Sequence, residues 1–324
     1  MRKSLQNLAY YLVLGLTLAI SRLPFWVLYR ISDVVFFLAY WVFKYRRKVV
    51  RDNIDRSFPN RSEAERTQIE RKFYRHLADL MVEVVKGATL GDRALKRRVK
   101  VRNPEMFTEI MERGASSILL TSHLGNFEFL CQYMDIQFGS KVPSYAIYTK
   151  LSNPISERLV QYIRGRRGLQ LIPMQHAMIK VMRALKEETC VVGFLADQSP
   201  HRGQRNYYTD FLHQLTAVHT SVAKFALKTK SPIYYADMRK VARGRYEVEL
   251  IKMDTESFLP YSDTHIRDYT DFQVKTLEKA IEEQPEIWLW SHRRWKLKPK
   301  PGDYVAGSGV VAEPVPTEDK KPSL

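Results

Sequence analysis

The stretch ASSILLTSHLGNFE, residues 115–128, joins a short apolar strand to a polar turn. Its first half predicts a strand because the apolar run is short and is bounded by turn residues. Ligands in open α/β sheets bind beyond the carboxyl ends of the strands, so we expect His123 to face a substrate crevice. Gly125 and Asn126 tolerate the backbone angles of a tight turn. We expect this turn to bring the Glu128 carboxylate back to the imidazole, which would make His123 a general base.

Short apolar runs and helical patterns alternate along the rest of the chain. This alternation is typical of βαβ units and of a largely parallel sheet. After the strand at 115–121, candidate strands lie at 142–148, 169–173, 189–196, 232–238 and 246–251, with candidate helices at 154–164, 177–186 and 266–283. The sequence therefore predicts an α/β fold with a mostly parallel central sheet flanked by helices.

The N-terminal segment, residues 1–43, is strongly apolar, and we expect it to be embedded in a membrane. Residues 8–20 carry no charge, and residues 23–43 are interrupted only by Arg30 and Asp33. Neither run is a clean apolar span of about 20 residues. Together they predict either a membrane hairpin or one tilted span followed by an interfacial helix. A cleaved signal peptide is the alternative for the first run, but no small-residue cleavage site follows it.

Basic residues follow the apolar segment at once, and they suggest how the chain is divided. They are Lys44, Arg46, Arg47, Lys48 and Arg51. Such a cluster marks the cytoplasmic side and attracts anionic headgroups, although a solvated helix face is the plainer alternative. We expect a membrane anchor at 1–43, a main domain at 44–302 and a disordered tail at 303–324, which lacks periodicity. Within the main domain, a helical lead-in at 44–100 precedes an α/β core at 101–302.

The charge balance and the cysteines limit the classes of partner and site. The 324-residue chain has a net charge of +17, which suits nucleic acid, an anionic membrane surface, or an acidic protein or lipid. The position of the apolar segment favours the membrane over nucleic acid. Cys131 and Cys190 cannot build a disulfide framework, and neither has a zinc-site spacing, so no metal site is predicted.

Polar residues also follow the other predicted strands. Tyr148, Thr149 and Lys150 follow the second, and Asp197, Gln198 and Ser199 follow the fourth. Because parallel strands end at one edge of the sheet, these groups are expected to share one site. A buried structural carboxylate is the alternative for Asp197. Arg164 is a candidate clamp for phosphate or an oxyanion, or else simply a cation favoured at a helix end.

These motifs together resemble the bacterial lipid A biosynthesis acyltransferases, within the lysophospholipid acyltransferase-like superfamily. The matching blocks are 121–128, which contains the family's H-x4-E pattern, 163–168, 196–198, 228–233 and 285–299, with weaker matches at 45–50 and 53–59. The resemblance covers about residues 20–300. H-x4-E alone would not be specific, but the combination of blocks is.

The resemblance implies an O-acyltransferase in which His123 is the general base and Glu128 its acidic partner. Arg164 and Asp197 match positions important for activity in the family, and Asn126 and Gln198 lie in the same blocks as supporting or substrate-binding residues. The donor that the resemblance implies is acyl-acyl carrier protein. The implied acceptor is a phosphorylated, acylated glucosamine disaccharide. No metal or organic cofactor is implied.

The resemblance further implies a location at the cytoplasmic (inner) membrane of a bacterium, with the catalytic domain on the cytoplasmic side. One departure concerns the acceptor. Residues 199–203, SPHRG, replace the acidic or aromatic continuation of better-known members, and this segment is expected to shape the acceptor or acyl pocket. The identity of the acceptor therefore stays open at this point.

Three other functions compete with this interpretation. An enzyme of the same superfamily could use the same chemistry on a phospholipid, an amino-acid lipid or a glycolipid. A hydrolase could use His123 and Glu128 on water, but no G-x-S-x-G elbow is present. A membrane-tethered nucleic-acid binder would explain the charge, yet the chain has no recognisable binding motif.

Overall fold

A computed structural model describes residues 2–139, 141–200, 206–253 and 261–311. Its centre is a seven-stranded sheet in the order β1-β9-β8-β2-β5-β3-β4. Neighbouring strands run parallel except for β8 and β9, which form an antiparallel hairpin. The strands are β1 (Val99–Val101), β2 (Ser117–Thr121), β3 (Ser144–Tyr148), β4 (Gln170–Pro173), β5 (Val191–Leu195), β8 (Ile233–Ala242) and β9 (Arg245–Met253). The predicted α/β class with a mostly parallel sheet is confirmed.

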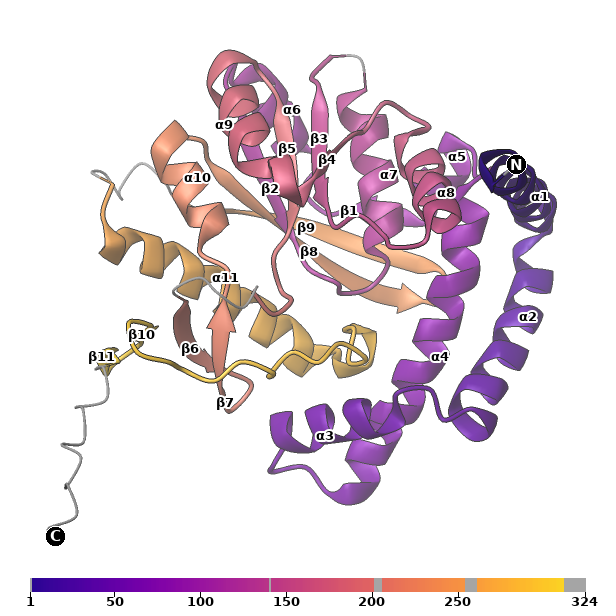
Figure 1. Ribbon diagram of the computed structural model, residues 1–324, viewed down its shortest axis with the longest axis horizontal. Coiled ribbons are helices and arrows are strands. Elements are labelled where there is room, and N and C mark those ends of the chain that lie inside the picture. Colours follow the sequence, from indigo (N-terminus) through magenta and orange to yellow (C-terminus); the bar gives the residue numbers. More distant parts are fainter. Residues whose placement is uncertain (1, 140, 201–205, 254–260, 312–324) are drawn as a thin grey trace, which may run out of the picture.

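Helices cover both faces of this sheet (Figure 1). Along β2, Ile118 and Leu120 pack into one hydrophobic cluster, while Leu119 packs into the other. Burial on both faces explains why Ile118, Leu119 and Leu120 form a continuous apolar run in β2 instead of alternating with polar residues. The flanking helices are α6 (Glu105–Glu112), α7 (Phe127–Phe138), α8 (Pro154–Gly165), α9 (Ala177–Glu187), α10 (Ser221–Thr229) and α11 (Asp263–Glu283).

A second, smaller sheet lies beside the first and includes part of the predicted tail. Its order is β11-β10-β6-β7, built from β6 (Tyr207–Phe211), β7 (Gln214–Val218), β10 (Tyr304–Val305) and β11 (Gly309–Val310). The prediction of a disordered tail is wrong for residues 303–311. Asp303 is fully buried and accepts a hydrogen bond from the Asn206 amide at 2.8 Å, which ties this segment to β6. Residues 312–324 lie outside the described part of the chain.

The helical lead-in is α3 (Arg47–Ser57), α4 (Glu63–Gly87) and α5 (Asp92–Lys96). Before it come α1 (Arg2–Arg22), α2 (Phe25–Phe37) and a π-helical turn, η1 (Leu38–Val42). The segments Ser4–Arg22 and Phe25–Val42 are each long and apolar enough to cross a membrane by length and composition. Two apolar helices that could be embedded in a membrane agree with the expectation for this segment.

The helix α2 packs along α4 rather than standing apart from the domain (Figure 1). Its inner face is buried at Leu28 and Ser32, and the Ser32 hydroxyl donates to the Asp79 carboxylate on α4 at 2.8 Å. Arg243, from the turn between β8 and β9, bridges Asp79 and Asp33 of α2. Since Asp79 is buried, these contacts fix α2 to both the helical layer and the sheet.

Removing a buried side chain of α2 tests whether this helix is part of the cooperative fold. Leu28→Ala is expected to cost about 2–5 kcal/mol, because Leu28 is 0% exposed and its loss leaves a cavity against α4. Trp26→Ala, at a position 71% exposed on the same helix, is the matched control and should change stability by less than about 0.5 kcal/mol. Thermal unfolding in detergent measures both. Equal effects of the two variants would show that α2 is only an appendage.

Candidate functional site

Strand register brings His123 and Asp197 together. In the parallel pair β2–β5, Thr121 lies opposite Leu195. His123 and Asp197 each follow two residues after this pair, so they leave the two strands side by side at the carboxyl edge of the sheet. The Nδ1 atom of His123 lies 2.7 Å from Asp197 Oδ1, and the His123 backbone amide donates to Asp197 Oδ2 at 3.0 Å.

The Asp197 carboxylate is buried and held in its charged form. Trp288 donates its indole Nε1–H to Asp197 Oδ2 at 2.9 Å, in addition to the two contacts from His123. Burial alone raises the pKa of Asp197, but the electrostatic interaction with His123 and these hydrogen bonds outweigh it and lower the pKa to about 2. The carboxylate is thus ionised at neutral pH.

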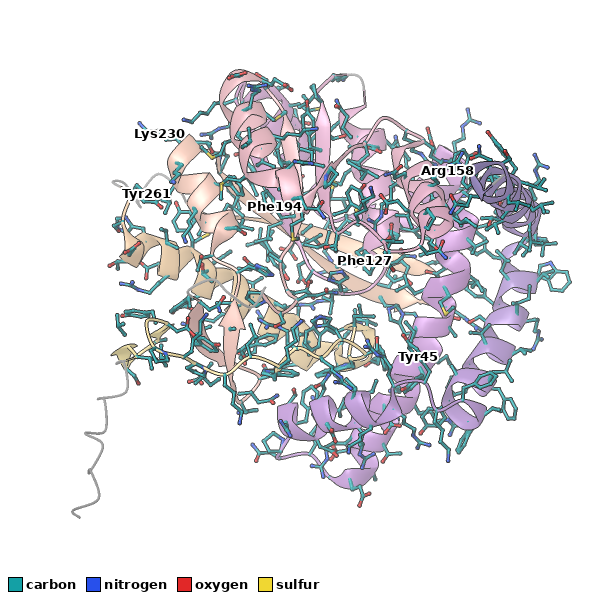
Figure 2. All side chains as sticks on the ribbon, viewed as in Figure 1. Tyr45, Phe127, Arg158, Phe194, Lys230 and Tyr261 are labelled. Atoms are coloured by element: carbon teal, nitrogen blue, oxygen red, sulfur yellow. The ribbon has the colours of Figure 1, made fainter. Side chains whose placement is uncertain are left out.

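The contacts of His123 specify one tautomer. An ionised carboxylate only accepts hydrogen bonds, so the proton facing Asp197 belongs on Nδ1. On the other side of the ring, the Gln198 side-chain amide nitrogen lies 3.2 Å from Nε2 and can donate to it. Both contacts leave the Nε2 lone pair unprotonated, which is the state that a general base needs. The edge of the Phe127 ring, near the centre of Figure 2, lies against the imidazole with ring centroids 4.8 Å apart.

The expected contact between Glu128 and His123 is wrong. The Glu128 carboxylate is instead paired with Arg164 on α8, whose Nε donates to Oε2 at 2.9 Å and whose Nη2 donates to Oε1. The physical reason is the helix α7, which begins at Phe127 with Asn126 as its cap. Glu128 therefore lies in the first helical turn, where its side chain reaches α8 while Asp197 occupies the position beside the imidazole.

Arg164 lies where its charge can act on the site. Burial lowers the pKa of Arg164, but the hydrogen bonds and the charge of Glu128 outweigh that effect and raise it above its ordinary value. The neighbouring Arg166 and Arg167 donate to backbone carbonyls at residues 88 and 90 and stabilise the end of α4. The three arginines thus differ: Arg164 lines the site cavity, whereas the other two hold the packing of helices.

Asn126 supports the turn from inside the protein. Its side-chain oxygen accepts the Phe129 amide at 2.8 Å, and its side-chain nitrogen donates to Glu83 on α4 at 2.7 Å. Asn126 is 0% exposed, so we assign it to positioning. At Gly125 the backbone has a φ of +62°, and an added Cβ would lie 2.8 Å from the Met238 sulfur. Both the angle and the space therefore require glycine in this turn.

A cavity of about 400 Å³ opens at His123 and collects the predicted strand-end residues. Its lining includes Arg164, Gln198, Tyr148, Thr149 and Ser199, which come from the ends of three different elements. Four of the residues that were expected to share one site, namely Tyr148, Thr149, Gln198 and Ser199, thus line one cavity. Lys150 does not line this cavity, and residues 201–205, which contain most of the unusual SPHRG segment, lie outside the described residues.

Sequence reasoning missed three cavity residues. His219 follows β7, and His292 and Lys296 come from the C-terminal segment, which returns to the sheet edge. Backbone pairing explains the return, because the Leu289 amide donates to the His123 carbonyl. Ser199 Oγ and His292 Nδ1 are buried without a hydrogen-bond partner among the described residues. The density of aromatic and basic residues at 288–298 was the one available signal.

Comparison with known proteins agrees with this site. The family model for bacterial lipid A biosynthesis acyltransferase matches residues 1–297. The lipid A biosynthesis lauroyltransferase of Escherichia coli strain K12 is 24% identical over 290 residues, which cover 90% of this chain and 92% of the relative. The lipid A biosynthesis palmitoleoyltransferase of the same strain is 22% identical over 284 residues, covering 86% and 88%. A lipid A biosynthesis acyltransferase of Haemophilus influenzae is 22% identical, covering 80% and 82%.

The chain therefore belongs to the bacterial lipid A biosynthesis acyltransferase family. It is an O-acyltransferase, and the resemblance inferred from its motifs is confirmed.

The pairing of Glu128 with Arg164 makes a prediction that differs from a direct role of Glu128 on the imidazole. Glu128→Gln and Arg164→Lys should each lower kcat for acyl transfer by about 100-fold, because either change breaks the two-pronged pairing and displaces the guanidinium. The double variant should be little worse than either single variant. Arg158→Lys on the same helix is the matched control, since Arg158 instead contacts Tyr10 and Asn7 of α1 (Figure 2).

Steady-state kinetics of the purified variants measure these effects. A severe loss in Glu128→Gln together with a near-normal rate in Arg164→Lys would contradict the assignment, because Glu128 would then act independently of Arg164.

Proposed function

We propose that this protein transfers a fatty acyl chain from acyl carrier protein to a hydroxyl of a lipid A precursor, with His123 as the general base. The observation that carries the proposal is the His123–Asp197 pair, in which Asp197 holds Nδ1 and His123 lines the cavity. The family supports acyl transfer in lipid A biosynthesis. The donor, the acceptor hydroxyl and the roles of individual residues are our proposals.

The proposed reaction uses the chain's own groups throughout. The acceptor hydroxyl first displaces the Gln198 amide from His123 Nε2. Nε2 then takes the proton of the hydroxyl as the hydroxyl oxygen attacks the thioester carbonyl carbon. Asp197 stabilises the resulting imidazolium across the 2.7 Å contact. The tetrahedral intermediate carries a negative oxygen, and the Arg164 charge at the cavity wall favours it. The carbon–sulfur bond then breaks, and the imidazolium returns the proton to the leaving thiolate.

The roles of the two acids differ from those expected from the motif. Asp197 orients His123, because it contacts the Nδ1 atom directly. Glu128 positions Arg164, because both of its oxygens are engaged by that guanidinium. Gln198 helps to fix the imidazole from the opposite side. This assignment keeps both acids essential but gives them separate tasks.

Electrostatics support the two proposed substrates. Acyl carrier protein is acidic and the proposed acceptor is phosphorylated, whereas this chain has a net charge of +17. A surface of that sign accelerates encounters with anionic partners, although salt screens the effect. Lys296 and Arg164 extend the positive charge into the cavity wall itself.

Loss of the base tests the proposed mechanism. His123→Ala should lower transfer of labelled acyl chains from acyl carrier protein to the lipid A precursor by about two to four orders of magnitude. Asp197→Asn should also be severely impaired, because an amide can present a hydrogen to Nδ1 and so favour the wrong tautomer. The double variant should be no worse than His123→Ala, since the two residues act as one unit. Melting curves run in parallel control for folding.

Near wild-type transfer by a folded His123→Ala protein would remove the assignment of the base. Transfer to another lipid hydroxyl but not to the lipid A precursor would instead show that the acceptor is different.

We also propose that α1 and α2 hold the enzyme at the cytoplasmic membrane surface, with the main domain on the cytoplasmic side. Both helices are apolar, and their outward side chains are exposed. The inner side of α2 is fixed to the domain by Asp79 and Arg243, charged groups that a hydrocarbon core would exclude. In an interfacial position the apolar outer faces of the helices lie in lipid, while the charged groups on the inner side of α2 stay out of the hydrocarbon core. The basic residues from Lys44 onward then meet anionic headgroups.

The outward stripe of α1 tests this anchor without disturbing the fold. Replacing Leu8, Leu12 and Leu16 by Gln should move the protein from the membrane pellet to the salt-washed supernatant, because these side chains are 57–65% exposed and supply apolar contact with lipid. A triple Gln variant at the exposed positions Met178, Ile179 and Leu215 is the matched control and should stay in the pellet. Unchanged sedimentation of the α1 variant would contradict this mode of attachment.

A further inference from the structure

A second cavity, of about 850 Å³, lies between the end of α2 and α4. Its walls are mainly apolar and include Leu38 and Ala39 of η1 and Leu77 and Met81 of α4. The volume falls within the range of pockets that bind small organic ligands. The reaction steps described above do not use this cavity.

The path of the chain around η1 explains the open space. The Phe43 amide donates to the Leu38 carbonyl five residues earlier, at 2.8 Å, so this turn is wider than an α-helical turn. Lys44 and Arg46 then adopt left-handed backbone angles, with φ of 47° and 51°, which are costly for residues other than glycine. The chain therefore leaves α2 abruptly, and the region beside α4 is not filled by a continuing helix.

The inner end of this apolar cavity reaches the catalytic cavity. Gln198 and His292 line both. Gln198 is also the residue whose side-chain nitrogen lies 3.2 Å from His123 Nε2. Burial and the charges of Lys296 and Arg294 lower the pKa of His292 to about 4, so this shared wall is uncharged at neutral pH. A chain lying in the apolar cavity would thus point its polar end at the base without meeting a buried charge.

The outer end opens on the apolar face that we assign to the membrane. Phe43 and Met81, at 73% and 55% exposed, line the cavity and also belong to the protein surface. Trp41 and Val42 continue this exposed apolar surface along η1. Arg46 also lines the cavity, but it donates to the carbonyl of Ser291, the neighbour of His292 at the inner end, at 2.9 Å. This contact fixes a cation near the polar end of a chain that enters from the membrane.

We propose that this cavity binds an acyl chain that the lipid acceptor already carries, taken directly from the membrane. The inference rests on the function proposed above and adds a binding site for the acceptor. The mouth of the cavity among exposed apolar residues favours the acceptor, because that lipid resides in the membrane while the donor chain arrives on a soluble, acidic carrier. The fixed cation at Arg46 matches a phosphorylated lipid.

A separate, smaller cavity offers space for the donor chain. A cavity of about 260 Å³ near α9 and α10 is lined by Phe194 and Phe225. It shares Ile147 and Met174 with the catalytic cavity. The two substrates can therefore reach His123 through different cavities, the acceptor through the α2–α4 cavity and the donor through the α9–α10 cavity.

Filling the α2–α4 cavity tests the proposal. Ala39→Trp and Met81→Trp should each raise KM for the acylated acceptor at least 10-fold and leave KM for acyl-acyl carrier protein unchanged. Val42→Trp, in the same turn but outside the cavity lining, is the matched control and should leave both values unchanged. An acceptor stripped of its acyl chains should be used equally by the wild type and the variants. Two variants on different elements guard against misfolding of either one.

An unchanged KM for the acceptor in both folded variants would overturn the proposal, and so would a rise in KM for the donor alone. A second measurement does not depend on catalysis. Lysophosphatidic acid with a diazirine at the end of its chain, placed in vesicles and irradiated, should cross-link to residues of α4 or η1, and Met81→Trp should reduce the yield several-fold. Cross-links confined to other segments would overturn the site. Absence of transfer by the wild type with cross-linking at α4 would reject the proposed function but retain the lipid site.

Discussion

The parallel pairing of β2 with β5 determines the rest of the site. Because Thr121 and Leu195 are opposite each other, the residues two positions beyond them leave the sheet edge as a pair. One strand supplies an imidazole and the other a carboxylate, and the backbone amide of His123 adds a second bond to the same carboxylate. A slip of one residue in this register would turn every side chain of the strand to the opposite face and separate the two groups. Sheet register is thus the constraint under which the catalytic chemistry is arranged.

The helix α4 links this edge to the N-terminal helices. Its Glu83 carboxylate is fully buried and accepts hydrogen bonds from Asn126 in the catalytic turn, from Tyr246 in the sheet and from Tyr29 on α2. Four elements therefore meet at one acid. Burial raises the pKa of Glu83, while the hydrogen bonds from Tyr246 and Asn126 lower it, so the network compensates part of the cost of burying the group. The anchor, the helical layer and the catalytic turn are positioned together.

The two cavities differ in polarity and open on different surroundings. The apolar α2–α4 cavity opens among exposed apolar residues, and the catalytic cavity adds Arg164 and Lys296 to its own wall. An enzyme that joins a soluble donor to a membrane lipid must receive its substrates from two phases. The placement of the N-terminal helices against α4 meets this requirement, because the helix that touches lipid in our proposal is also a wall of the cavity that leads to the base. The π-helical turn η1 and the left-handed backbone angles that follow it are the local strain that this arrangement requires.

The sequence by itself determined the α/β class, the strand ends and the polar strand-end residues of the catalytic cavity, because hydrophobic periodicity is local and parallel strands end at one edge. It also determined the family through blocks of short motifs. It did not determine which acid contacts His123. Glu128 is near in sequence, but the helix that starts at Phe127 carries it to Arg164, whereas Asp197 reaches the imidazole from 74 residues away. The second sheet, the return of the C-terminal segment and the α2–α4 cavity likewise depend on contacts between distant segments. Periodicity cannot encode such contacts, so only the tertiary structure decided them.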